Sequence, residues 1–246
     1  MKPDRPLKRL EHNGHSAGFY GLSQCCMRTL VHSVWRSGLR ISGTENIPAA
    51  GPALVAVNQT THLDPLFIAI AVARPIHFIG VDDGGDAEPW YTPLLYRSIG
   101  VIDRPQKLLR SGGHHFASSL EAAVEYGELI GIFPEGRIER KRDRTAITPF
   151  RKGVATIARL YHLPVVPVLL RGTENVIPNS TARLHEKIYV RPVHISIGGP
   201  IPAEDVIDGE AVRQVLFELE RLTIEDPLFQ QEPKPAEEYC SSAGSG

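Results

Sequence analysis

Short apolar runs alternate with amphipathic stretches through the middle of this chain. Each run is bounded by turn-forming or polar residues, as buried strands are, while the stretches between the runs carry apolar residues at three-and-four spacing, as helices do. We expect strands at 53–57, 76–80, 129–133 and 165–170. We expect helices at 65–73, 116–126 and 150–161. Helices that link successive strands in this way predict an α/β fold with a mostly parallel central sheet flanked by helices.

The C-terminal third carries two further predicted elements. Residues 188–197 alternate in side-chain type as a strand does, but they contain Pro192, and proline cannot donate a hydrogen bond to a neighbouring strand. We therefore expect an edge or bulged strand that ends the sheet. Residues 203–224 start with acidic residues and then present a broad apolar face, which predicts a terminal helix. The apolar face consists of Val206, Val212, Leu216, Leu219 and Leu222.

Shifts in composition near both ends predict the organisation of the chain. Residues 1–38 are expected to form an N-terminal helical segment, because they contain apolar positions near helical spacing, and this segment either packs on the core or lies in a membrane interface. Residues 39–226 are expected to form one domain. After Pro227 the chain becomes polar and finally rich in small residues, so that 227–246 are expected to be a disordered tail.

Charge, cysteine content and hydropathy narrow the class of protein. The 246 residues include 27 Lys and Arg against 28 Asp and Glu, and this net charge of -1 argues against a nucleic-acid partner. The three cysteines, Cys25, Cys26 and Cys240, have neither disulfide-framework nor zinc-ligand spacing. No apolar run approaches the roughly 18 residues that span a bilayer. We expect a cytoplasmic protein that contacts membranes at most peripherally.

Four short motifs accompany the predicted strands. They occur at 58–65, 100–104, 132–137 and 163–168. The first contains Asn58, Asp64 and Pro65, and the third reads Ile-Phe-Pro-Glu-Gly-Arg. In content and order these motifs resemble those of the glycerolipid (1-acylglycerol-3-phosphate) acyltransferase family, and the resemblance covers roughly 39–172.

The resemblance implies a reaction and a set of site residues. In that family a histidine acts as general base, an aspartate holds its imidazole, and the acceptor attacks an acyl thioester of coenzyme A or of acyl carrier protein. The acceptor would be a lysolipid, a glycerol-phosphate-like molecule or an amine, and neither a resident cofactor nor a metal is implied. The catalytic positions correspond to Gln59 and Asp64, with His62 as a substitute base. The substrate-binding positions correspond to Asn58, Arg104, Phe133, Pro134, Glu135, Gly136 and Arg137.

The residue that departs from the family pattern is Gln59, which stands where the histidine is expected. A carboxamide donates and accepts hydrogen bonds but has no accessible pKa. Three hypotheses follow. In the first, His62 serves as the base, with Asp64 adjusted to pair with it or with a neighbour. In the second, the acceptor needs little base assistance, and positioning and thioester polarisation supply the rate. In the third, the site is a degenerate binding or scaffolding pocket, or Gln59 is an engineered inactivation. We expect an acyltransferase with atypical or weakened base catalysis, the alternative being a noncatalytic acyl-chain or lipid binding protein.

Overall fold

The central feature of the fold is one mixed β-sheet with helices on both faces. The computed structural model describes residues 29, 38–61, 63–80, 101–102, 114–136, 146–176, 192–225 and 227. The strands are β1 Leu39–Ser42, β2 Ala53–Val57, β3 Ile76–Ile79, β4 Val101–Ile102, β5 Leu129–Ile132, β6 Val165–Arg171 and β7 Val193–Ile197. The helices are α2 Asp64–Ala71, α5 His114–Glu125, α6 Gly153–Leu160 and α7 Glu210–Ile224, with 3₁₀ turns η1 Thr44–Asn46, η2 Thr173–Asn175 and η3 Ala203–Asp205.

Within the described residues the strand order is β1-β7-β6-β2-β5-β3-β4, and every neighbouring pair is parallel except β6 and β7. β2 occupies the centre, between β5 and β6, with Ala56 opposite Ile132 and Val57 opposite Val168. All of β2 is buried, as expected of a parallel strand covered on both faces. The α/β fold with a mostly parallel sheet is therefore confirmed.

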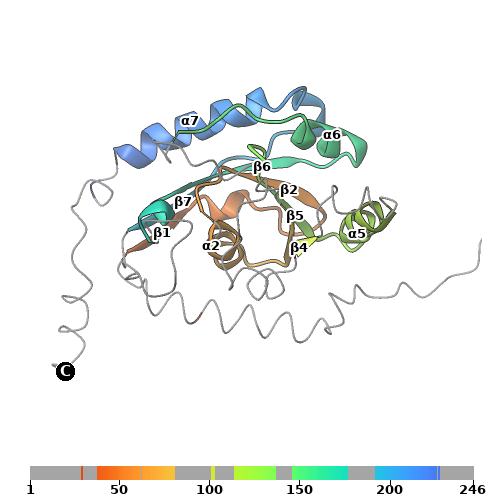
Figure 1. Ribbon diagram of the computed structural model, residues 1–246, viewed down its shortest axis with the longest axis horizontal. Helices are drawn as coiled ribbons and strands as arrows, with labels where there is room; N and C mark the ends of the chain where they lie inside the picture. Colours follow the sequence, from red (N-terminus) through yellow and green to blue (C-terminus); the bar gives the residue numbers. More distant parts are fainter. Residues whose placement is uncertain are drawn as a thin grey trace, which may run out of the picture.

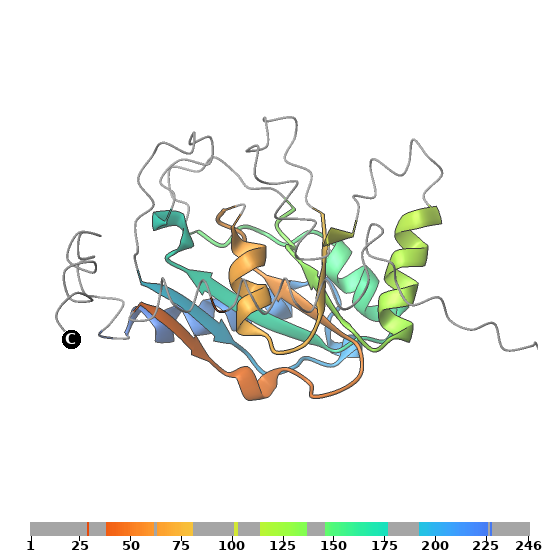
Figure 2. The ribbon, with the colours of Figure 1, turned by 90° about the horizontal axis from the view of Figure 1, so that it is seen from below.

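Two apolar layers hold the helices to the sheet. On one face α2 packs against β2, β3, β6 and β7. On the other face α5, α6 and the start of α7 pack against β2, β5 and β6, and α7 continues along β6. Figure 1 shows this sandwich, with α6 and α7 on one side of the sheet and α2 on the other. Turned by 90°, α5 lies at the opposite end of the sheet from β1 (Figure 2).

The elements predicted in the middle of the chain are all present. The four expected strands are β2, β3, β5 and β6, the three expected helices are α2, α5 and α6, and their ends differ from the prediction by at most three residues. The sequence patterns did not reveal β1 or β4. β1 alternates between half-buried and exposed residues and β4 is only two residues long, so neither has the continuous apolar run of a central strand.

The strand expected to end the sheet was placed wrongly. β7 starts at Val193, one residue after Pro192, and it lies between β1 and β6. Because Pro192 precedes the strand, β7 loses no ladder hydrogen bond to proline and pairs along both edges. Residues 188–191 lie outside the described part of the chain.

The predicted C-terminal helix is shorter than expected. Residues 203–205 form the 3₁₀ turn η3, and α7 begins only at Glu210. Gly209 has a φ of 92°, a left-handed conformation that separates the two elements and that glycine adopts without strain. Leu222, expected on the buried face of this helix, is 55% exposed.

The expectations for the chain ends cannot be compared with the structure. Residues 1–38 and 227–246 lie outside the described residues, apart from Thr29, Gly38 and Pro227. Among the residues that are described, no helix has both the length and the hydropathy needed to cross a membrane.

Candidate functional site

The candidate site lies where three neighbouring parallel strands end. β6, β2 and β5 are adjacent, so the segments that follow them meet at one edge of the sheet. The segment after β2 begins with Asn58 and Gln59, the segment after β5 contains Glu135, and the turn after β6 contains Thr173. This carboxyl edge is where ligands bind in open α/β sheets.

Asn58 extends the sheet with its side chain. Its Nδ2 donates to the carbonyl oxygen of Leu170 over 2.9 Å, and its Oδ1 accepts from the N–H of Leu170 over 2.7 Å. The buried side-chain amide thus makes the pair of hydrogen bonds that a backbone peptide would make. Asn58 thereby fixes the position at which the chain leaves β2.

Gln59 is joined to the Phe-Pro-Glu-Gly segment through its backbone. Its N–H donates to Oε1 of Glu135 over 3.1 Å, while Oε2 of Glu135 accepts from the N–H of Thr148 over 3.0 Å and from the Thr148 hydroxyl. The side-chain oxygen of Gln59 is buried and has no hydrogen-bond partner among the residues that the structure describes. A buried acceptor of this kind requires an explanation, since most such atoms in proteins are paired.

Asp64 closes the loop that begins at Asn58. One carboxylate oxygen accepts from the N–H groups of Thr60 and Thr61 over 2.6 and 2.9 Å. The other accepts from the hydroxyls of Thr61 and Thr173 over 2.7 and 2.8 Å. Complete burial raises the pKa of Asp64 from its usual 3.8 to about 6, against the opposite effect of these hydrogen bonds.

The third predicted motif forms a tight turn beside this loop. Phe133 is buried and its ring stacks on that of Phe78 at a centroid distance of 5.7 Å. The N–H of Gly136 donates to the carbonyl of Phe133 over 3.0 Å, and the carbonyl of Pro134 accepts from the N–H of Arg151 over 2.8 Å. This turn presents the Glu135 carboxylate to the backbone of residue 59.

The predicted site residues divide into two groups. Seven of them lie together at the carboxyl edge: Asn58, Gln59, Asp64, Phe133, Pro134, Glu135 and Gly136. His62, Arg104 and Arg137 fall outside the described residues. Whether His62 pairs with Asp64, and whether the two arginines bind phosphate, therefore stay predictions.

Four threonines that sequence reasoning did not select belong to this cluster. Thr60 and Thr61 lie inside the first motif, and their position just before an aspartate is a signal for local hydroxyl and N–H bonding to that carboxylate. Thr148 and Thr173 had weaker signals, since a single threonine after a strand or in a loop is common. Only the spatial neighbourhood identifies them.

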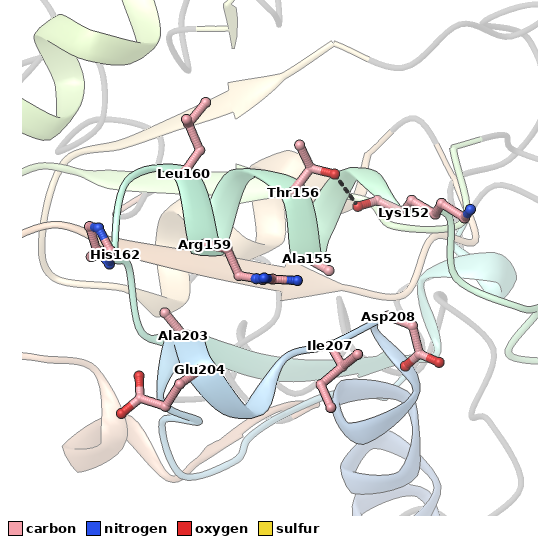
Figure 3. A pocket seen from close by; sticks show the side chains of 10 residues that line it. All are labelled: Lys152, Ala155, Thr156, Arg159, Leu160, His162, Ala203, Glu204, Ile207 and Asp208. Carbon is pink, nitrogen blue, oxygen red and sulfur yellow. Dashed lines mark hydrogen bonds between the residues drawn. The ribbon is translucent and has the colours of Figure 1, made fainter.

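A separate groove of about 1110 Å³ lies between α6 and the segment around η3 (Figure 3). Arg159 of α6 and Lys152, just before this helix, line one wall of the groove, and Glu204 and Asp208 line the other from the segment around η3. None of the described site residues contributes to its walls. The groove is thus distinct from the cluster at the carboxyl edge.

The sequence of this chain is similar to the sequences of several known proteins. The sequence profile of the acyltransferase family matches residues 38–171. The 1-acyl-sn-glycerol-3-phosphate acyltransferase of Borreliella burgdorferi is 28% identical over 180 residues, which make up 70% of this chain and 69% of that protein. An uncharacterised protein of Mycobacterium tuberculosis is 32% identical over 168 residues, or 63% of this chain, and the chain spans only 44% of its length.

The fold has a counterpart among solved structures. The crystal structure of the 1-acyl-sn-glycerophosphate acyltransferase PlsC from Thermotoga maritima superposes with a TM-score of 0.59 at 20% sequence identity, covering 87% of this chain and 81% of that one. At this identity the likeness concerns the fold. The profile match, however, spans more than half of the chain and includes both motif segments that meet at the carboxyl edge. The resemblance inferred from the four motifs is confirmed, and the protein belongs to the acyltransferase family of enzymes.

Proposed function

We propose that this protein transfers an acyl group from a thioester, acyl-CoA or acyl carrier protein, to a lysolipid, glycerol-phosphate-like or amine acceptor, with Gln59 orienting the acceptor. The name of the Borreliella relative, a 1-acyl-sn-glycerol-3-phosphate acyltransferase, supports an acceptor of the lysolipid type. Such a reaction would be a step of phospholipid synthesis. Because lysolipids reside in membranes, we further propose that the protein works in the cytoplasm at a membrane surface.

The observation that carries this proposal is the unpaired side-chain oxygen of Gln59. The residue is only 7% exposed, and no group in the described part of the chain donates a hydrogen bond to its Oε1. Leaving a buried acceptor unpaired costs about 1–3 kcal/mol. An O–H or N–H group of a bound acceptor would supply the missing hydrogen bond and would be oriented by it.

The chemistry of a carboxamide limits what Gln59 contributes. The acceptor oxygen or nitrogen attacks the thioester carbonyl carbon, the C–S bond breaks, and the leaving thiolate takes up, through solvent, the proton that the acceptor loses. Gln59 aligns the acceptor for this attack but does not receive the proton. Since a positioned general base contributes about 10² to 10⁴ in rate, we expect slow turnover with hydroxyl acceptors and faster turnover with amines.

The test is an acyl-transfer assay on the full chain. Palmitoyl-CoA and palmitoyl acyl carrier protein serve as donors, and 1-acylglycerol 3-phosphate, glycerol 3-phosphate and a long-chain primary amine serve as acceptors. Gln59→Ala is expected to raise the KM for the acceptor and lower kcat, whereas Gln214→Ala, on the exposed face of α7, is expected to leave both unchanged. Binding of palmitoyl-CoA without turnover on any acceptor would overturn the proposal in favour of a noncatalytic lipid-binding protein.

A second pair of variants tests the competing role of His62. If Gln59 only orients the acceptor and no side chain acts as base, His62→Ala retains turnover within a few-fold. The control is His162→Asn, which alters an exposed histidine after α6 and keeps a residue type that tolerates its φ of 54°. A loss of about 10² or more in His62→Ala alone would identify His62 as the base instead.

A further inference from the structure

The carboxylate of Asp64 has no free hydrogen-bonding position. An ionised carboxylate offers about four lone-pair sites, two on each oxygen. Oδ2 accepts from the N–H groups of Thr60 and Thr61 over 2.6 and 2.9 Å, and Oδ1 accepts from the hydroxyls of Thr61 and Thr173 over 2.7 and 2.8 Å. Four donors thus occupy four sites, all in a buried environment.

The hydroxyl of Thr60 joins this network mainly through the hydroxyl of Thr173. It lies 2.8 Å from the Thr173 hydroxyl oxygen and makes longer hydrogen bonds, of 3.3 and 3.2 Å, to Oδ1 and Oδ2 of Asp64, so that Thr173 is its shortest partner. Because Thr173 donates its single proton to Asp64, the Thr60 hydroxyl donates to Thr173. Thr173 therefore links the loop after β2 to the turn after β6.

This arrangement leaves no acceptor for an imidazole. In the family the aspartate holds the catalytic histidine, which requires one lone pair of the carboxylate to accept the imidazole N–H. We propose that Thr173 occupies that lone pair, so that Asp64 anchors the loop and acyl transfer in this protein does not use a histidine–aspartate pair. The inference deepens the proposed function and rests on it. Thr173 is a positioning residue, since it acts through Asp64.

The proposal predicts that introducing a histidine at position 59 is not enough to form a histidine–aspartate pair. Gln59→His alone introduces an imidazole when every lone pair of the Asp64 carboxylate already accepts a hydrogen bond. In the double variant with Thr173→Val, the valine is similar in size to threonine but has no hydroxyl. One lone pair of the Asp64 carboxylate is then free to accept a hydrogen bond from the introduced imidazole. The charged side chains that the neighbouring described segments bring to this loop are Glu135, bonded to the backbone of residue 59, and Glu174, next to Thr173. The test must therefore separate pairing with Asp64 from pairing with Glu135.

The experiment is an NMR titration of the introduced imidazole in the full-length protein, assigned by difference from the ten native histidines. In Gln59→His we expect a pKa no higher than the ordinary value of about 6.5. In Gln59→His with Thr173→Val we expect the pKa to rise by about one unit or more, because the carboxylate now stabilises the imidazolium. Adding Asp64→Asn should abolish the rise, which identifies Asp64 rather than Glu135 as the partner.

Two further variants control for the change at residue 173. Gln59→His with Thr173→Ser keeps the hydroxyl and should behave as the single variant does. Gln59→His with Thr156→Val removes a hydroxyl from the exposed face of α6 and should do the same. The proposal is overturned if the introduced imidazole of the Gln59→His variant already has a pKa well above the ordinary value and if adding Asp64→Asn lowers it again. Asp64 would then accept a hydrogen bond from an imidazole while Thr173 is present. That comparison decides the question even if Thr173→Val does not fold.

Turnover of the same variants separates this inference from the proposed function. We expect at most a few-fold gain in kcat from Gln59→His and about 10²-fold from the combination with Thr173→Val. Equal large gains in both variants would overturn the inference. If no variant turns over but the titrations follow the expected pattern, the proposed function fails while the role of Thr173 is supported, because the titration requires no catalysis.

Discussion

The backbone N–H of Gln59 donates a hydrogen bond to Oε1 of Glu135, which joins two segments 76 positions apart in the chain. The same carboxylate accepts from the backbone and hydroxyl of Thr148. Glu135 therefore acts as the common acceptor for the segment after β2 and the segment before α6. This connection holds residue 59 at the carboxyl edge of the sheet, whatever its side chain.

Replacing Glu135 by alanine removes the acceptor of the three hydrogen bonds just described. We expect Glu135→Ala to lower the free energy of unfolding by about 2–4 kcal/mol, because it removes the acceptor of the buried N–H of Gln59 and of the half-buried N–H of Thr148. Urea denaturation at neutral pH measures the effect. Glu218→Ala, on the exposed face of α7, should change the same quantity by less than about 0.5 kcal/mol. A loss for Glu135→Ala as small as that of the control would contradict the bridging role.

Asn58 should be more important for stability than an asparagine with a single bond. Asn58→Ala removes both partners of the Leu170 backbone, one donor and one acceptor, at a buried position. We expect a loss of about 2–4 kcal/mol in the free energy of unfolding. The matched control is Asn46→Ala, which removes one bond of 2.8 Å to the Ile197 carbonyl at a half-buried position and should cost about 1 kcal/mol. Similar losses in the two variants would show that Asn58 does not extend the sheet.

Asp64 should make stability depend on pH in an unusual direction. Burial raises its pKa in the folded protein from the usual 3.8 to about 6, so the folded state binds the proton more tightly than the unfolded state. The contribution of this raised pKa to the free energy of unfolding is complete below about pH 4 and is lost as the pH rises through about 6. The total loss is about 3 kcal/mol, because each unit of pKa difference corresponds to about 1.4 kcal/mol. The free energy of unfolding of the native chain should therefore fall relative to that of Asp64→Asn across this window. Parallel pH profiles for the two proteins would refute the raised pKa.

Gly172 should tolerate no side chain. Its φ is 94°, and a Cβ added there would lie 2.0 Å from the carbonyl oxygen of Pro192. Since a backbone atom cannot move aside as a flexible side chain can, we expect Gly172→Ala to cost more than about 2 kcal/mol and to displace Thr173. In contrast, a Cβ at Gly199 would meet no atom within 4 Å, so Gly199→Ala serves as the control and should be nearly neutral. Equal thermal unfolding midpoints for the two variants would contradict this prediction.

The sequence alone was sufficient for the central elements and the family. β2 and β5 are continuous apolar runs and α6 has a strong apolar face, and such periodic patterns are local properties of the chain. The motifs at 58–65 and 132–137 also follow directly from the order of residues, as does the presence of Gln59 at the position where the family resemblance predicts a histidine. The placement of β7 was not predictable in this way, because its two neighbours, β1 and β6, are far from it in the sequence or antiparallel to it.

Only the tertiary structure decided which polar groups meet at the site. Thr173 lies 109 positions from Asp64, and Thr148 lies 13 positions from Glu135 with no periodic pattern to connect them. Hydrogen bonds between distant residues depend on how strand ends are brought together, and hydroxyl side chains are too common for their presence to predict a partner. The sequence therefore placed Gln59 at the position where the family resemblance leads one to expect a base, whereas the folded arrangement determined that Thr60, Thr61 and Thr173 donate to the carboxylate of Asp64.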